Sequence, residues 1–236
     1  AAPRLGLRES TWKDLATQVD LIIHAGVSRS MLDSYQTLRG ANFESTKTLV
    51  SLAAKRRIPI HFMSSGSLAS LNGDTPPTGG SMGYLASKWA SERYLSNAAG
   101  KLGVPVVIHR ITPPATDISS PQVDTVLADL TVMAKTLGAT PSFNSQATSS
   151  HSVDLIWSQL LVERIVSTAE STPQQMEVVQ HHCDATIDLQ SAAQHVSAGE
   201  NADLPQLPFA QWLGRAKHAG FEWLVASMDN FPLPSA

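Results

Sequence analysis

In the first half of the chain, continuous apolar runs alternate with apolar residues at helical spacing. The runs at 19–24, 58–63 and 104–109 predict three short strands, and the first is expected to be buried on both faces. Helical spacing predicts helices at about 38–57 and 84–102 between them. Strand and helix in strict alternation, with short connections, favour parallel strands joined by right-handed crossovers.

The second half of the chain has a different pattern. Residues 123–137 and 152–167 are expected to form amphipathic helices, and residues 176–180 a strand. Residues 72–80 form a turn-rich run, expected either to cover a substrate or to be a plain connection. We therefore expect an α/β fold with a second, smaller part after residue 122.

Composition and charge narrow the class of protein. A chain of 236 residues with 42% hydrophobic residues can bury a substantial core. The net charge is -3, and the basic triplet at 55–57 suits a helix C-terminus better than a nucleic-acid surface. No apolar run has the length of a membrane span, the first residues do not form a signal peptide, and Cys183 is a single cysteine. A cytosolic location and no membrane partner are the expectation.

Candidate chemistry lies around Ser65, Tyr84 and Lys88. On a helix, Tyr84 and Lys88 emerge on one face, and an ammonium beside a phenol lowers the pKa of the phenol toward neutral. Such a phenol can donate or accept a proton, while a serine hydroxyl holds a carbonyl oxygen. A tyrosine four residues before a lysine also occurs on ordinary amphipathic helices. The order of the strands and helices around the pair therefore decides whether a catalytic role is favoured. In open parallel sheets, sites lie at the carboxyl ends of strands, where Ser65, Gly26 and Thr112 are expected.

These residues resemble the extended short-chain dehydrogenase/reductases, and within them the thioester reductase-like terminal domains of multimodular synthetases. The resemblance is strongest in residues 22–26, 38–42, 59–65 and 83–93, and it continues more weakly through 152–154 and 209–228. The chain is most similar to the release domains that end fungal hybrid polyketide synthase-nonribosomal peptide synthetases. By this resemblance, Ser65, Tyr84 and Lys88 take the catalytic positions.

The chain departs from that family where the family holds NADPH. The family's glycine-rich turn, which binds the pyrophosphate, has no counterpart in the sequence, and the first strand corresponds to the family's fourth. Residues 110–114 replace an Arg-Pro turn, and residues 25–27 replace Asn-Gly-Ala. No cofactor is therefore expected from this chain alone. If a preceding segment supplies the turn, NADPH is expected, with contacts from Gly26, Asn42 and Lys88.

The resemblance implies a partial Rossmann-like parallel sheet with flanking helices and a small C-terminal substrate lobe. The expected division is a truncated Rossmann-like core at 1–122, which carries the Ser-Tyr-Lys set, and a mainly helical lobe at 123–236. The aromatic residues of the tail are assigned to the core of this lobe. Docking of a carrier protein or of an acyl chain is the alternative for them.

The resemblance also implies release of a carrier-bound aminoacyl polyketide. We expect a redox-independent Dieckmann cyclisation to a tetramic acid, with Tyr84 and Lys88 in proton transfer and Ser65, Ser67 and Thr112 at the oxyanion or substrate. NADPH-dependent reduction to an aldehyde or alcohol is the alternative, and an inactive docking remnant is a third. The implied partners are a phosphopantetheinyl carrier protein with its acyl substrate and the upstream synthetase domains.

The adjacent His181, His182 and Cys183 invite a metal-binding interpretation. Neighbours in an extended segment point to opposite faces, however, and the sequence has no second ligand cluster. No metal site is therefore expected.

Overall fold

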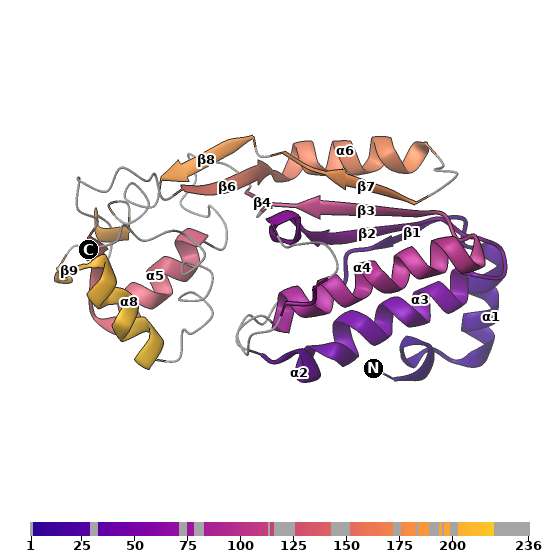
Figure 1. Ribbon diagram of the computed structural model, residues 1–236, viewed down its shortest axis with the longest axis horizontal. Helices are drawn as coiled ribbons and strands as arrows, with labels where there is room; N and C mark the ends of the chain where they lie inside the picture. The colour runs from indigo at the N-terminus through magenta and orange to yellow at the C-terminus, as the bar shows by residue number, and fades with distance from the viewer. Residues whose placement is uncertain are drawn as a thin grey trace. The chain divides into compact units, whose positions relative to one another are not determined.

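The structure is a computed structural model (Figure 1). It describes residues 2–28, 33–70, 75–77, 83–112, 114–115, 126–142, 152–171, 176–182, 184–188, 194, 196–198 and 203–219. Most of the predicted turn-rich run at 72–80, Cys183 and the tail beyond Ala219 lie outside the described residues. No helix within the described part is both long and apolar enough to cross a membrane.

Contacts divide the chain into two compact units. The first unit comprises Ala1–Thr112 and Val162–His182, and the second comprises Pro113–Leu161 and Cys183–Ala236. This division differs from the expected boundary after residue 122, because residues 162–182 return to the first unit and extend its sheet.

A four-stranded parallel sheet forms the centre of the first unit (Figure 1). Its strands, in spatial order, are β1 (Ile22–His24), β2 (Ile60–Ser65), β3 (Val106–Ile111) and β7 (Glu177–Gln180). The first three lie within or close to the predicted apolar runs, and almost all of β2 and β3 is buried, as a sheet covered on both faces requires. The predicted α/β class with a partial Rossmann-like parallel sheet is confirmed.

Most helices of the first unit lie on one face of this sheet, and α6 (Ser158–Glu170) is drawn on the other side (Figure 1). The helical elements of the unit are η1 (Pro3–Gly6), α1 (Glu9–Gln18), α2 (Tyr35–Arg39), the π-helical turn η2 (Gly40–Glu44), α3 (Ser45–Ala53), the 3-10 helix η3 (Gly66–Ser70), α4 (Gly83–Leu102) and α6, the last of which begins in the second unit. Leu95 of α4 and Val50 of α3 are buried against Phe62 and Ile108 of the sheet. Each such side chain contributes about 2 kcal/mol of hydrophobic free energy.

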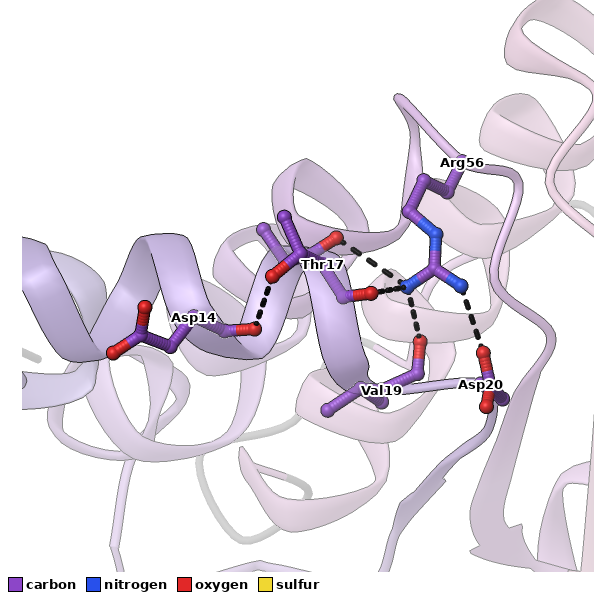
Figure 2. Close-up of polar contacts among 6 residues, drawn as sticks. Asp14, Thr17, Val19, Asp20 and Arg56 are labelled. Atoms are coloured by element: carbon purple, nitrogen blue, oxygen red, sulfur yellow. Dashed lines mark hydrogen bonds and ion pairs between the residues drawn. The ribbon is translucent and has the colours of Figure 1, made fainter.

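Arg56 closes the C-terminal end of α1 (Figure 2). Its Nη1 donates to the carbonyls of Thr17 at 2.8 Å and Val19 at 2.9 Å, and its Nη2 donates to the Asp20 carboxylate at 2.7 Å. These carbonyls belong to the last residues of a helix, which have no partner within the helix. Arg56 of the basic triplet at 55–57 therefore caps a neighbouring helix.

The second unit mixes strands and helices. Its described elements are β4 (Pro114–Ala115), α5 (Val126–Leu137), β5 (Thr140–Ser142), β6 (Ser152–Trp157), β8 (Ala185–Asp188), β9 (Gln206–Pro208) and α8 (Phe209–His218). Trp212 is fully buried, and its Nε1 donates to the Ala139 carbonyl at 2.9 Å. The helix predicted at 152–167 is wrong in its first half, because β6 pairs there with β8. The described residues of this unit thus include short strands beside the helices that we expected.

Candidate active site

Lys88 of α4 reaches the carboxyl end of β2. Its side chain is buried, its Nζ donates to the Met63 carbonyl at 2.6 Å, and the same nitrogen lies 4.7 Å from the centre of the Phe62 ring. Burial lowers the pKa of Lys88 to about 8, and the charge of Glu92 partly offsets that decrease. Lys88 therefore releases its proton closer to neutral pH than an ordinary lysine.

Tyr84 lies one helical turn before Lys88. The Lys88 Nζ is 5.9 Å from the centre of the Tyr84 ring, so the two groups share one side of the helix. The helix starts at Gly83, where an added Cβ would overlap the backbone carbonyl of Asp33. Only glycine therefore allows the start of α4 to approach the segment before α2 so closely. This contact fixes the position of Tyr84, the next residue of the helix.

Ser65 and Thr112 are brought to the same edge of the sheet. Ser65 ends β2 opposite Ile111, which ends β3, and Thr112 follows directly. Gly66 passes so close that an added Cβ would lie 3.1 Å from the Ile111 oxygen. Ser67 is exposed in the next turn. The Thr112 hydroxyl is buried and has no hydrogen-bond partner among the described residues, which makes it a candidate ligand for a substrate oxygen.

Asn42 is engaged by the protein itself. Its Oδ1 accepts from the Ser28 backbone N–H at 2.7 Å, and its Nδ2 donates to the Ser28 carbonyl at 3.1 Å and to the Ser87 hydroxyl at 2.9 Å. Ser87 in turn donates to the Tyr84 carbonyl at 2.7 Å. Asn42 sits in the π-helical turn η2, an irregularity that recurs at functional sites. It ties the segment after β1 to the helix that carries Tyr84 and Lys88.

The carboxyl end of β1 carries His24 and Gly26. The His24 Nε2 lies 3.1 Å from the Thr46 hydroxyl, and burial together with the charge of Lys88 lowers the pKa of His24 to about 4. Gly26 is exposed, and an added Cβ there would meet nothing closer than the His24 ring at 3.9 Å. A nicotinamide cofactor would therefore find space at Gly26 and further N–H donors on Lys88. The polar atoms of Asn42 are already in use.

A buried ion pair lies one turn beyond Lys88, and the sequence analysis missed it. Glu92 accepts from the Ser64 hydroxyl at 2.6 Å, from the Arg110 Nε at 3.1 Å and from the Arg110 Nη2 at 2.8 Å. Its position four residues after Lys88 placed it on the same helix face, and that spacing was the available signal. The partners on two strands could not be identified without the register of the sheet.

Three histidines form a row on the other face of the sheet. His61 Nδ1 lies 3.0 Å from His109 Nε2, and His109 Nδ1 lies 2.9 Å from His181 Nε2. The rings are stacked, with centres 5.2 and 5.1 Å apart. His181, which had suggested a metal ligand, is thus part of a hydrogen-bonded row. No group of three or more potential ligands among the described residues is arranged to hold a metal ion.

The fold is the Rossmann-like fold of the short-chain dehydrogenase/reductases. An NAD-binding family model described as "Male sterility protein" matches residues 1–159, so the chain belongs to this family. The chain is 38% identical over 235 residues to "Trichosetin synthetase PKS-NRPS1" of Gibberella fujikuroi. That match covers 96% of this chain but only 6% of the relative. The predicted resemblance to domains of fungal hybrid synthetases is confirmed.

Two solved structures illustrate the shared fold. The terminal R domain from the myxalamid PKS-NRPS pathway has a TM-score of 0.68 at 24% identity, covering 94% of this chain and 60% of that one. The PhqB reductase domain from Penicillium fellutanum has a TM-score of 0.66 at 19% identity, covering 97% and 62%. At these identities, the likeness establishes the fold.

Proposed function

We propose that this chain releases an acyl group from a carrier-protein thioester by redox-independent Dieckmann cyclisation to a tetramic acid. One observation carries the proposal: the amine of Lys88, with its pKa lowered to about 8, is buried beside Tyr84 at the carboxyl end of β2. An amine that titrates close to neutral pH, placed beside a phenol, suits the removal of a proton from an acidic carbon.

The proposed reaction is balanced in protons and electrons. The phenolate of Tyr84, stabilised by the positive charge of Lys88, takes the proton from the carbon between the two carbonyls of a β-ketoamide. That carbon attacks the thioester carbonyl, so that a carbon–carbon bond forms and the carbon–sulfur bond breaks. The departing thiolate then takes the proton from Tyr84, and no hydride is transferred.

The developing oxyanion needs hydrogen-bond donors. Ser65, Ser67 and Thr112 supply hydroxyl groups at or after the ends of β2 and β3, and that of Thr112 is buried without a partner among the described residues. A preorganised donor that is already desolvated stabilises a transition-state oxyanion more than a solvated one. We assign Thr112 and Ser65 to this role, with Ser67 at the exposed side of the substrate.

The proposed partner is a phosphopantetheinyl carrier protein with its acyl substrate, delivered by upstream synthetase domains. The similarity to a named fungal hybrid synthetase over 96% of this chain supports this partner. The chain spans about 6% of that relative's length, so the other steps of such an assembly belong to other segments of the relative.

Reductive release is the second candidate, and membership in an NAD-binding family favours it. When bound, NADPH would supply the hydride that reduces a thioester to an aldehyde or alcohol. Gly26 and Lys88 are the residues of this chain that would hold it, while Asn42 would continue to fix the segment at Ser28. The Ser65, Tyr84 and Lys88 side chains would then orient and protonate the carbonyl oxygen.

Substitution of Tyr84 tests the proposal. The 236-residue chain is supplied with a carrier-bound β-ketoamide thioester, and the cyclised product is measured by mass spectrometry with and without NADPH. Tyr84→Phe should lower the rate of cyclisation by about 100-fold, the usual size of a general acid-base contribution. Tyr94→Phe, on the same helix and in contact with Phe43, is the matched control and should retain activity.

Other outcomes separate the candidates. A reduced product that forms only with NADPH would favour reductive release. Unchanged release after combined substitution of Ser65, Tyr84 and Lys88 would instead favour a docking role without catalysis. Unchanged cyclisation in Tyr84→Phe alone would remove Tyr84 from the mechanism.

A further inference from the structure

We propose that Ser64, Glu92 and Arg110 form a clamp that positions Lys88, so that Glu92 and Arg110 are positioning residues of the site. The catalytic meaning of this clamp rests on the proposed function. Its geometry does not, because each contact lies within the first unit of the structure.

The clamp joins one helix to two strands. Ser64 of β2 and Arg110 of β3 are paired in the sheet register and face α4 from neighbouring strands. Both donate to the same carboxylate, that of Glu92, which lies two helical turns after Tyr84 and one after Lys88. Because Arg110 binds through two nitrogens in a planar fork, the carboxylate has one preferred orientation.

The same strand end is also held by Lys88. The Lys88 ammonium donates to the carbonyl of Met63, and Glu92 accepts from the hydroxyl of the next residue, Ser64. Two successive residues of β2 are therefore fixed to α4, and Ser65 follows directly. The clamp thus fixes the end of β2, from which Ser65 extends, to the helix that carries Tyr84 and Lys88.

The clamp also controls the charge around Lys88. The Glu92 carboxylate opposes the effect of burial and keeps the pKa of Lys88 from falling further. The guanidinium of Arg110 shares that negative charge, and its hydrogen bond to Glu92 raises the pKa of Arg110 itself. Arg110 therefore remains a cation and limits how strongly Glu92 favours the protonated form of Lys88.

Anchoring of the helix does not by itself require charges. Leu95, one turn further along α4, is fully buried and attaches the helix to the sheet through apolar contacts. A buried ion pair is often no more stabilising than apolar residues of the same volume. Glu92 and Arg110 also border a cavity of about 200 Å³, which is shared with Trp89. A role in setting position and charge accounts for this pair better than stability does.

The test measures the titration of Lys88 directly, by NMR of a chain with 13C- and 15N-labelled lysine, and the rate of release in parallel. Glu92→Gln keeps the shape but removes the charge, so the pKa of Lys88 should fall by roughly one unit. The kcat of release should fall about 10-fold with KM changed less than about twofold, since positioning acts on the reacting complex. Ser64→Ala removes one attachment without changing any charge, and it should lower kcat while moving the pKa less.

Glu9→Gln removes an exposed carboxylate that pairs with Lys13 and should change neither readout. A clamp that is merely structural would lower the melting temperature of Glu92→Gln but leave the Lys88 titration and the pH profile of kcat unchanged, and this result overturns the proposal. If Glu92→Gln fails to fold, Ser64→Ala decides by the kcat of release: a lower kcat supports the clamp, and an unchanged kcat overturns it. If Tyr84→Phe retains release, the proposed function fails, whereas the Lys88 titration still judges the clamp.

Discussion

The two faces of the parallel sheet bury polar side chains across β2 and β3 in opposite ways. Toward α4, the Ser64–Glu92–Arg110 clamp is charged. On the other face, the histidine row is composed of His61, His109 and His181. Residues alternate between the two faces along a strand. Ser64 and Arg110 therefore face α4, whereas His61 and His109 of the same two strands face the other side.

The two arrangements differ in how completely their hydrogen bonds are satisfied. The Glu92 carboxylate receives three donors, whereas the histidine row leaves His61 Nε2 buried without a partner among the described residues. A neutral imidazole has one N–H, so each link of the row depends on the tautomer of the next ring. The clamp is therefore held by charge, while the row depends on remaining neutral.

Acid should therefore weaken the histidine face most. Burial, and then the neighbouring rings, lower the pKa of His109 to about 4, below its ordinary value of 6.5. The unfolded chain then binds this proton first, so the free energy of unfolding should fall as pH decreases from 6.5 toward 4. One such residue accounts for a loss of up to about 3 kcal/mol. Urea denaturation at pH 7 and pH 4.5 measures the decrease.

Two variants isolate the contribution of the row. His109→Phe should make the pH dependence shallower, whereas His218→Gln, at the exposed end of α8, should leave it unchanged. His24 contributes with the same sign in every variant, because its pKa is also lowered to about 4. An identical slope in His109→Phe would show that the row does not titrate in this range.

Breaking the clamp should have the second-largest effect. Arg110→Met leaves the buried Glu92 carboxylate with only the Ser64 hydroxyl, so the free energy of unfolding should decrease by about 2 kcal/mol at pH 7. The estimate is below that of a fully buried pair because Arg110 is 25% exposed. Arg39→Met, which breaks an exposed pair with Glu44, is the control and should cost less than about 1 kcal/mol. Equal costs would contradict the distinction between buried and exposed pairs.

The sequence predicted those parts of the fold that depend on local pattern. The strands β2 and β3 were predicted because continuous apolar runs of that length occur in strands buried on both faces. The strand β6 was missed because its residues fit helical spacing as well, and the antiparallel partner that decides the matter, β8, lies about 30 residues further along.

The candidate site was predictable to a similar extent. Tyr84 and Lys88 were found because their spacing on one helix is a local signal. The histidine row joins residues that are 48 and 72 positions apart, and only the register of three strands brings them together. Asn42 was predicted to contact a cofactor because it lies in the segment 38–42, which resembles the family. Its bonds to Ser28 and Ser87 depend on the π-helical turn, which the sequence pattern did not indicate.

A single hydroxyl should have a smaller effect on stability than the ion pair. Ser64→Ala removes a neutral donor from a carboxylate that keeps both bonds from Arg110, and it should cost about 1.5 kcal/mol. Ser51→Ala removes an exposed bond to the Thr48 carbonyl and should cost less than about 0.5 kcal/mol. Urea denaturation of both variants at pH 7 checks this, and a cost of Ser64→Ala as small as that of Ser51→Ala would show that Arg110 alone holds the carboxylate.

The smallest effect is expected at the unsatisfied end of the histidine row. His61→Phe loses one hydrogen bond to His109, but it also removes the buried Nε2 that has no partner among the described residues. The lost hydrogen bond destabilises the fold, and removal of the unsatisfied nitrogen stabilises it by a similar free energy. A phenyl ring can also keep the stacking on His109. The free energy of unfolding at pH 7 should therefore change by less than about 1 kcal/mol. A loss of about 3 kcal/mol would mean instead that His61 Nε2 has a partner and that the histidine face is as fully satisfied as the clamp.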